Sequence, residues 1–202
     1  MIQAGRVSQH ELNKRNSYRS TTQRRRINEL VHFTRVENIA SILQHGIVPR
    51  DNLDELGINA IINDYDRLDG HMDASSISVS FPNNRMFYRY RNKDLSSLWA
   101  VISLEPKLLY DTSIKEFYFF EHNAARSDVS RCSFEGMFGE SKDDEPSDVE
   151  AEVLAFGVVS PKYIKKIYVN NQQAADYIKK HTNFQNIEFN PKYFSYRRKD
   201  YL

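Results

Sequence analysis

The 202-residue sequence has few of the residues that mark several protein classes. Its one cysteine, Cys132, excludes an internal disulfide and a zinc site built from several cysteines. Glycine (7) and proline (6) are also scarce, which argues against a low-complexity chain or a propeller. No apolar run approaches the roughly 18 residues of a membrane-spanning helix, and the N-terminus lacks the apolar core of a signal peptide. We therefore expect a cytoplasmic protein with no membrane partner.

The sequence also has little net charge and lacks several catalytic signatures. A formal charge of +1 gives no overall preference for nucleic acid, so any such site must come from local clusters. There is no glycine-rich phosphate loop and no Gly-x-Ser-x-Gly elbow. The six histidines show no metal-binding pair on one helix face, so we expect no metal. A hydrophobic content of 40% is typical of a globular domain.

The segment from Asn28 to Asn52 predicts the unit around which the domain is organised. Residues 30–34 read as a short buried strand, and residues 38–45 as an amphipathic helix that ends at Gly46, a typical C-cap. His32 places a polar ring inside the apolar strand. It is either a core histidine with its hydrogen bonds satisfied or a ligand-binding residue.

Short strands and few helices predict an α+β domain with a strongly bent or split sheet over residues 28–202. Residues 1–27 are basic and show no apolar periodicity. They are either a loosely ordered, solvated arm or an arm that contacts nucleic-acid phosphates. The acidic segment 133–147 is expected to be an exposed, mobile loop. Further strands are predicted at 75–81, 98–104, 117–120, 151–156 and 164–169, a helix at 172–180, and an extended end at 187–196.

Three further segments carry candidate chemistry. Residues 85–93 alternate cations with aromatics, which suits either a single-strand-binding surface or a helix with its aromatics turned inward. Arg67, in a long polar loop, is either paired with nearby aspartates or faces an anionic ligand. Glu150 and Glu152 lie on one side of a predicted strand because side chains alternate. They are either an acid/base pair or two surface glutamates.

Taken in order, these residues resemble the DarT family of ADP-ribosyltransferases, nucleic-acid-modifying toxins of bacterial toxin–antitoxin systems. Two departures leave the target base open: residues 70–80 replace a segment richer in proline and glycine, and residues 120–122 replace the more usual Thr-Asp-Gly. The resemblance rests on His32-Phe33-Thr34 with Asn38, Ile42, Leu43 and Gly46, on Arg67, on Met86-Phe87-Tyr88, on Phe119 to Ala124, on Ala151 to Leu154, and on Arg198 to Tyr201.

The resemblance implies an ADP-ribosyltransferase-like fold, with a split, strongly bent β-sheet flanked by helices. It also implies that NAD is the co-substrate and that the acceptor is thymine or guanine in single-stranded DNA. The chain would act as a toxin or anti-phage effector, with a macrodomain-containing antitoxin as partner. RNA, or protein arginine as suggested by Glu150, are alternative acceptors. A catalytically silent nucleic-acid-binding module is the alternative from a different class.

The resemblance also assigns roles to individual residues. Glu152 would stabilise the oxocarbenium ion and Arg67 would pair with the pyrophosphate, so both are predicted to be catalytic. His32 would contact the adenosine-side ribose, and Met86 or Tyr88 would pack on nicotinamide. The full set of cofactor-binding residues is His32, Phe33, Thr34, Asn38, Gly46, Met86 and Tyr88. The nucleic-acid-binding set is Arg85, Arg89, Arg91, Asn123, Arg197, Arg198 and Lys199.

Overall fold

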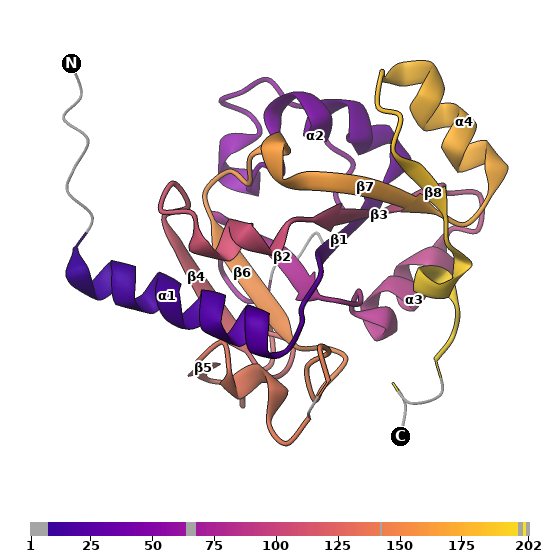
Figure 1. Ribbon diagram of the computed structural model, residues 1–202. Coiled ribbons are helices and arrows are strands. Elements are labelled where there is room, and N and C mark those ends of the chain that lie inside the picture. Colours follow the sequence, from indigo (N-terminus) through magenta and orange to yellow (C-terminus); the bar gives the residue numbers. More distant parts are fainter. Residues whose placement is uncertain (1–7, 64–67, 142, 198–199, 201–202) are drawn as a thin grey trace, which may run out of the picture.

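The computed structural model describes residues 8–63, 68–141, 143–197 and 200. These residues form an eight-stranded sheet with the order β5-β4-β6-β2-β1-β3-β7-β8, in which only the β7–β8 pair is parallel (Figure 1). The strands are β1 (Leu30–Arg35), β2 (Ala74–Val79), β3 (Trp99–Leu104), β4 (Glu116–Phe120), β5 (Arg131–Cys132), β6 (Glu152–Phe156), β7 (Ile164–Val169) and β8 (Ile187–Phe189). The α-helices are α1 (Gln9–Arg24), α2 (Ile39–His45), α3 (Asn84–Lys93) and α4 (Gln172–His181).

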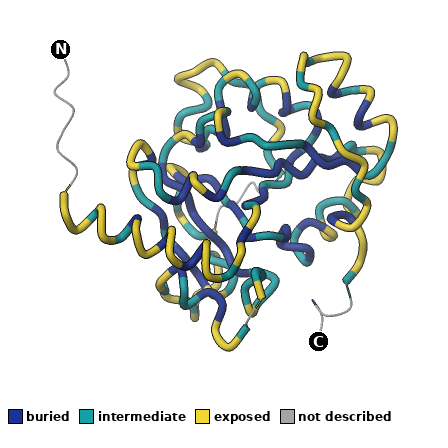
Figure 2. The backbone as a smooth tube through the Cα atoms, viewed as in Figure 1, coloured by how far each residue is buried: buried dark blue, intermediate teal, exposed yellow. Residues whose placement is uncertain are grey.

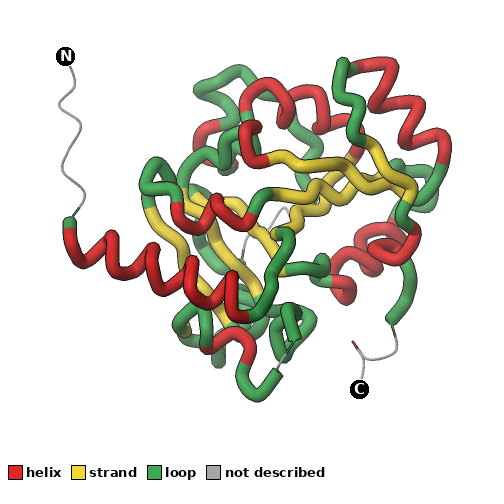
Figure 3. Tube along the Cα trace, viewed as in Figure 1, coloured by secondary structure: helices red, strands yellow, loops and turns green. Residues whose placement is uncertain are grey.

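The sheet is split between its two central strands. Strand β1 pairs with β3 along its whole length, but its register with β2 ends after Leu30 and Val31. Beyond Val31 the two strands diverge, and the two groups of strands run in different directions (Figure 3). The predicted α+β fold with a split sheet flanked by helices is therefore confirmed.

The two faces of the sheet are covered differently. One face packs against α1, α2 and α4 in a large core. The buried residues of the central strands are dark blue in Figure 2. The opposite face carries two separate clusters. One joins β1 and β3 to Phe87 of α3 and Phe194, and the other joins β2, β4 and β6 through Leu154 and Phe156. The two clusters are therefore separated at the place where β1 and β2 diverge.

The N-terminal segment forms the helix α1 over Gln9–Arg24, so the alternative of a loosely ordered arm is wrong for these residues. This helix lies across β4 and β6 (Figure 1). Its Arg15 is buried and donates hydrogen bonds to the Leu109 carbonyl (3.2 Å) and the Ile114 carbonyl (2.9 Å). Tyr18 packs edge-on against Phe119, with ring centroids 4.9 Å apart. The helix therefore buries Arg15, Tyr18, Thr21 and Thr22, and it lacks the apolar stripe that reveals most surface helices.

The acidic segment between β5 and β6 is also more ordered than predicted. Phe134, Met137 and Phe138 are fully or almost fully buried and belong to the main core. Burying these three apolar side chains lowers the free energy of the folded chain and anchors the segment, although acidic residues surround them in the sequence. The exposed, mobile loop expected here is thus an anchored segment.

The C-terminal segment is fixed to the start of β1 through one carboxylate. Glu29 accepts hydrogen bonds from the hydroxyls of Tyr168 (3.0 Å), Tyr193 and Ser103. Burial, followed by the interaction with Glu29, raises the pKa of both tyrosines well above the ordinary value. The two phenols therefore stay protonated and donate to Glu29. Among the described residues, no helix is long and apolar enough to cross a membrane.

Candidate functional site

A cavity of about 440 Å³ opens where β1 and β2 diverge. Its volume falls within the roughly 300–1,000 Å³ of ordinary ligand sites. The wall is formed by β1, by α2 and the chain after it, by the loop at residues 58–63, by β2, by one face of α3, by the turn at residues 123–126, and by the entry to β6. The split of the sheet therefore brings together segments that are distant in sequence.

His32 sits at the fork between the two strands. Its Nδ1 lies 2.8 Å from the Ser76 carbonyl oxygen of β2. A carbonyl can only accept, so Nδ1 carries the proton, and in the neutral ring Nε2 is the nitrogen that can accept. His32 lines the cavity and also joins the diverging strands, so both sequence interpretations of this residue have a structural basis.

Asn38 fixes one wall of the cavity. Its amide group donates to the Ile61 carbonyl (2.9 Å) and to the Thr34 hydroxyl (3.0 Å), while its oxygen accepts from the Ile61 N–H (2.8 Å). The Asn38 side chain thus holds the loop at residues 58–63 by bonding both the N–H and the carbonyl of Ile61, as a neighbouring strand would. Phe33 stacks on Phe87 of α3 and also lines the cavity.

Gly46 ends α2 with a φ of +92°, a conformation that glycine adopts without strain. A Cβ at this position would lie 2.3 Å from the Val159 carbonyl oxygen. The adjacent Ile47 forms an isolated bridge with Val159. Glycine is therefore required at position 46 by the close approach of the two backbones. Gly46 also lies in the cavity wall.

Helix α3 presents Met86, Arg89 and Tyr90 to the cavity. Tyr88, predicted as a nicotinamide contact, is outside the lining; it is 42% exposed and packs edge-on near Tyr196. The reason is helical geometry, since residues three and four apart share a face whereas residues two apart do not. Tyr90 therefore replaces Tyr88 in the cavity wall.

Glu152, at the start of β6, is a buried carboxylate in the cavity wall. It is 8% exposed and accepts hydrogen bonds from the Ser76 hydroxyl and from the Ala124 N–H (3.0 Å). The Ala124 donor belongs to a turn whose Asn123 also lines the cavity. These contacts fix the orientation of the carboxylate.

Glu150 also lines the cavity but has a different environment. Its carboxylate is 3.3 Å from the guanidinium of Arg85, which in turn donates from Nε to the Asp200 carbonyl (2.6 Å). The two glutamates therefore differ in the contacts described for them: Glu150 pairs with the Arg85 guanidinium, and Glu152 accepts from the Ser76 hydroxyl and the Ala124 N–H.

The predicted nucleic-acid-binding residues separate into two groups. Arg89 and Asn123 line the cavity. Arg85 is paired with Glu150, Arg91 packs on the ring of Phe87 (4.8 Å), and Arg197 pairs with Glu145 and Asp200. These last three cations stabilise the chain itself, which the sequence pattern alone does not reveal.

Three predicted residues, Arg67, Arg198 and Lys199, lie outside the described residues. Sequence reasoning missed Ser76, Tyr90 and Asn83, the last of which caps α3 by accepting from the Met86 N–H (3.0 Å). For Tyr90, the spacing of four residues from Met86 was the available signal. Across the described part of the chain, no three His, Cys, Asp or Glu residues gather as metal ligands do.

The family model of DarT, described as ssDNA thymidine ADP-ribosyltransferase, matches residues 31–195. The chain belongs to the DarT family. The resemblance to DarT seen in the sequence is confirmed. A similar curated protein is a DNA ADP-ribosyl transferase–DNA ADP-ribosyl glycohydrolase fusion protein of Thermosipho africanus. It is 26% identical over 188 residues, which are 82% of this chain and 48% of that protein.

Solved DarT structures share the fold. A structure of Thermosipho africanus DarTG in complex with ADP-ribose has a TM-score of 0.64 at 22% identity, covering 83% of this chain and 51% of that one. Thermus sp. 2.9 DarT in complex with NAD+ has a TM-score of 0.61 at 11% identity, covering 83% and 97%. The same Thermus protein in complex with ADP-ribosylated ssDNA gives 0.58 at 13% identity, covering 83% and 96%. The chain spans about half the length of the Thermosipho fusion protein.

Proposed function

We propose that this DarT-family chain transfers ADP-ribose from NAD to a base of single-stranded DNA, with thymine as the acceptor. The observation that carries the proposal is the Glu152 carboxylate, buried in the cavity wall and oriented by two donors. The family description names thymidine, and the Thermus relative has been solved with NAD+ and with ADP-ribosylated ssDNA.

In the proposed reaction, the glycosidic bond between nicotinamide and ribose breaks and nicotinamide leaves with the electron pair. Positive charge then develops on the ribose, and a fixed carboxylate beside it stabilises that charge. A ring nitrogen of the base forms the new bond to the ribose carbon and loses its proton, for which Glu152 is the acceptor. The hydrogen bonds from the Ser76 hydroxyl and the Ala124 N–H hold the carboxylate in one orientation for both tasks.

The β1–α2 side of the cavity is suited to the adenosine-side ribose. The Nε2 of His32 accepts a hydrogen bond from a ribose hydroxyl, and Thr34 and Asn38 complete a polar wall beside it. On this arrangement NAD extends from the β1–α2 end of the cavity toward Glu152. Its nicotinamide then lies near Met86 and Tyr90.

The direct test is incubation of the protein with labelled NAD and single-stranded oligonucleotides that each contain one base type. Transfer to the thymine-containing oligonucleotide, with its mass raised by one ADP-ribose, is the expected result. If only the guanine-containing oligonucleotide is labelled, guanine is the acceptor in place of thymine. If only RNA is labelled, the acceptor lies in RNA. The absence of label on every oligonucleotide would overturn the proposal.

Protein arginine is the second candidate acceptor, and Glu150 is the residue that bears on it. Arg85 of the chain itself pairs with Glu150 at 3.3 Å, so Glu150 is less suited to bind an acceptor arginine. This favours a nucleobase as the acceptor. Treating a labelled lysate with nuclease or with protease separates the two. Label that survives nuclease but is removed by protease would support the protein acceptor.

We further propose that the activity makes the chain a toxin or anti-phage effector, opposed by an antitoxin that removes ADP-ribose. The Thermosipho relative combines a DNA ADP-ribosyl transferase and a DNA ADP-ribosyl glycohydrolase in one protein, which supports such a pairing. Growth arrest on expression, reversed by co-expression of a macrodomain glycohydrolase, is the expected outcome. Arrest that the glycohydrolase does not relieve would contradict the pairing.

Replacing Tyr90 by alanine is expected to raise the KM for NAD severalfold, up to about tenfold, because an aromatic contact contributes roughly 0.5–1.5 kcal/mol beyond the burial of its area. Tyr88→Ala is the matched control, since it changes the same residue type on the exposed side of the same helix. Steady-state kinetics at saturating oligonucleotide measure both effects. If Tyr88→Ala raises the KM for NAD more than Tyr90→Ala does, Tyr88 is the nicotinamide contact, as the sequence predicted.

A further inference from the structure

The turn after β4 and the entry to β6 meet at one side of the cavity. The ladder between these two strands ends at the pair formed by Phe120 and Glu152. Beyond this pair, the turn contributes residues 123, 125 and 126 to the cavity lining, and the entry to β6 contributes residues 150–152. Since the ladder has ended, the hydrogen bonds that join the two segments here involve side chains.

Two such hydrogen bonds are described. The Ala124 N–H donates to Oε2 of Glu152 at 3.0 Å. Nδ1 of His122 lies 2.6 Å from Oδ2 of Asp148, and Nδ1 is the donor because a carboxylate can only accept. Both side chains are partly buried, with 39% of His122 and 24% of Asp148 exposed. The bond from His122 is thus a short contact to a charged group, of the stronger kind, next to the one that orients Glu152.

Asp148 fixes the entry to β6 through its other two oxygens. Its Oδ1 accepts from the Glu150 N–H (2.7 Å), and its carbonyl accepts from the Ala151 N–H (3.1 Å). Because Oδ2 binds His122, one aspartate joins the backbone just before Glu152 to the turn after β4.

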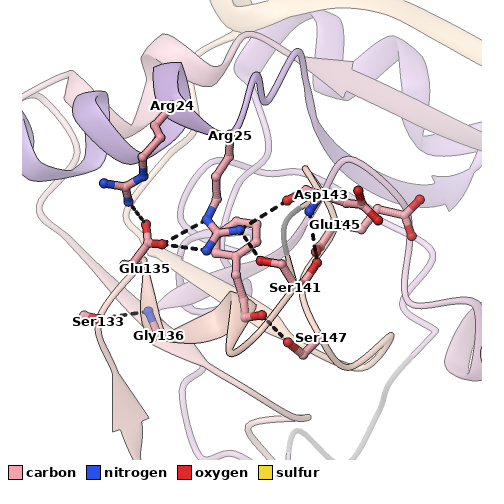
Figure 4. Close-up of polar contacts among 10 residues, drawn as sticks. Arg24, Arg25, Ser133, Glu135, Gly136, Ser141, Asp143, Glu145 and Ser147 are labelled. Atoms are coloured by element: carbon pink, nitrogen blue, oxygen red, sulfur yellow. Dashed lines mark hydrogen bonds and ion pairs between the residues drawn. The ribbon is translucent and has the colours of Figure 1, made fainter.

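The chain before Asp148 is itself anchored. Ser147 donates from its N–H to the carbonyl of Met137, which is fully buried. Arg25, the C-cap of α1, donates to the Ser141 carbonyl at 2.7 Å (Figure 4). Asp148 is therefore the fixed partner of the pair, and the turn is the part that the pair holds in place.

The turn at residues 122–126 has internal hydrogen bonds but is exposed on its far side. The Ala125 N–H donates to Oδ1 of Asn123 (2.8 Å), and the Arg126 N–H donates to the Asn123 carbonyl (3.1 Å). Residues 125–128 are exposed. A turn bonded in this way moves as a unit, so release at His122 would withdraw the Ala124 N–H from Glu152.

We propose that His122 and Asp148 are positioning residues for Glu152. Their hydrogen bond holds the turn at residues 122–126 against the entry to β6 and so keeps the Ala124 N–H on the Glu152 carboxylate. The inference rests on the proposed function, in which Glu152 is catalytic. Neither His122 nor Asp148 lines the cavity, and the residues assigned to NAD come from β1, α2 and α3. Breaking the pair should therefore affect the chemical step and leave NAD binding unchanged.

Four variants of the full chain isolate this contact. His122→Ala removes the donor. Asp148→Ser removes the acceptor for His122 but keeps an oxygen that can accept from the Glu150 N–H, because serine forms the same kind of turn as aspartate. His122→Asn restores a donor, since its amide N–H lies near the position of Nδ1. Glu121→Ala is the matched control, because it shortens an exposed side chain in the same turn.

The measurements are kcat at saturating NAD and oligonucleotide, the NAD Kd by titration, and hydrogen exchange of single amides. His122→Ala and Asp148→Ser should each lower kcat by about tenfold, because small misplacements of a catalytic group carry large costs. The double variant should be no slower than either single one, as expected for two residues that act through one contact. The NAD Kd stays at the wild-type value in all of them.

Exchange of the Ala124 amide reports on the positioning directly, and it needs neither NAD nor DNA. It should rise in His122→Ala and in Asp148→Ser, while exchange of the Val153 amide in the core of β6 stays unchanged. His122→Asn should return both kcat and the Ala124 exchange close to their wild-type values. Glu121→Ala should behave like wild type, since it leaves the pair intact.

Four results would overturn the inference while wild-type transfer stands. They are an unchanged kcat in His122→Ala, singles whose effects multiply in the double variant, a reduced kcat without faster Ala124 exchange, or an equal rise at Val153, which would indicate general destabilisation. Wild-type protein that labels no oligonucleotide would instead overturn the proposed function, and with it the catalytic role that this inference assigns to the positioning of Glu152.

Discussion

Glu152→Gln is expected to lower kcat for ADP-ribose transfer by about hundredfold to thousandfold, the range typical for loss of one preorganised electrostatic contact. Glutamine keeps the size and the acceptor oxygen of the side chain but carries no charge and accepts no proton. The NAD Kd should change little, because the adenosine end of the cavity is untouched. Single-turnover transfer from labelled NAD to a thymine-containing oligonucleotide measures the effect.

Glutamine is preferable to alanine because the structure places Glu152 in the interior, not at an exposed strand end. Alanine would leave the Ser76 hydroxyl and the Ala124 N–H without their acceptor, at a cost of about 1–3 kcal/mol in unfolding free energy. A loss of activity in that variant could then reflect a displaced turn. Glutamine preserves both contacts, since it can accept from Ala124 and donate to Ser76.

Glu150→Gln is the matched control for this variant, since it removes a carboxylate two residues earlier in the same cavity. It should retain most of the transfer to DNA. A Glu152→Gln protein that still arrests growth as wild type does would favour the catalytically silent binding module. Transfer that depends on Glu150 and not on Glu152 would contradict the assignment of roles to the two glutamates.

The unit from β1 to Gly46 was predictable because its structure is encoded locally. Apolar residues at strand spacing, an amphipathic helix and a glycine at the C-cap lie next to one another in the sequence. The structure places β1 and α2 where they were expected, and Gly46 has a positive φ. The cavity-facing side of α3 was also encoded, since Met86 and Tyr90 share a helix face.

Helix α1 and its contacts were not predictable in this way. The helix is stabilised by Arg15 and Tyr18, which reach residues about a hundred positions away in the sequence. The pairing of Arg25 with Glu135 is equally distant, and both residues look like surface charges in the sequence. The same holds for Arg85 and Arg197, because a cation bound to its own chain and one that awaits a phosphate have the same sequence pattern.

His32→Leu is expected to raise the NAD Kd by about tenfold to hundredfold and to lower the unfolding free energy by about 1–2 kcal/mol. Both effects follow from the loss of the ring nitrogens, since a buried acceptor left without its donor costs about 1–3 kcal/mol. On the protein side, the Ser76 carbonyl loses the bond that joins β2 to β1 at the fork. On the ligand side, the ribose hydroxyl loses the Nε2 acceptor.

Titration of NAD and thermal unfolding of the same samples separate these two roles of His32. Thr34→Val is a suitable control, because it removes a neighbouring hydroxyl that bonds Asn38 but does not join the two strands. If His32→Leu lowers the Tm while the NAD Kd stays at the wild-type value, His32 is a core histidine and its place in the cavity wall is incidental. A raised NAD Kd at temperatures where the variant is fully folded assigns it to the ligand, because the strand-joining bond alone would not then affect binding.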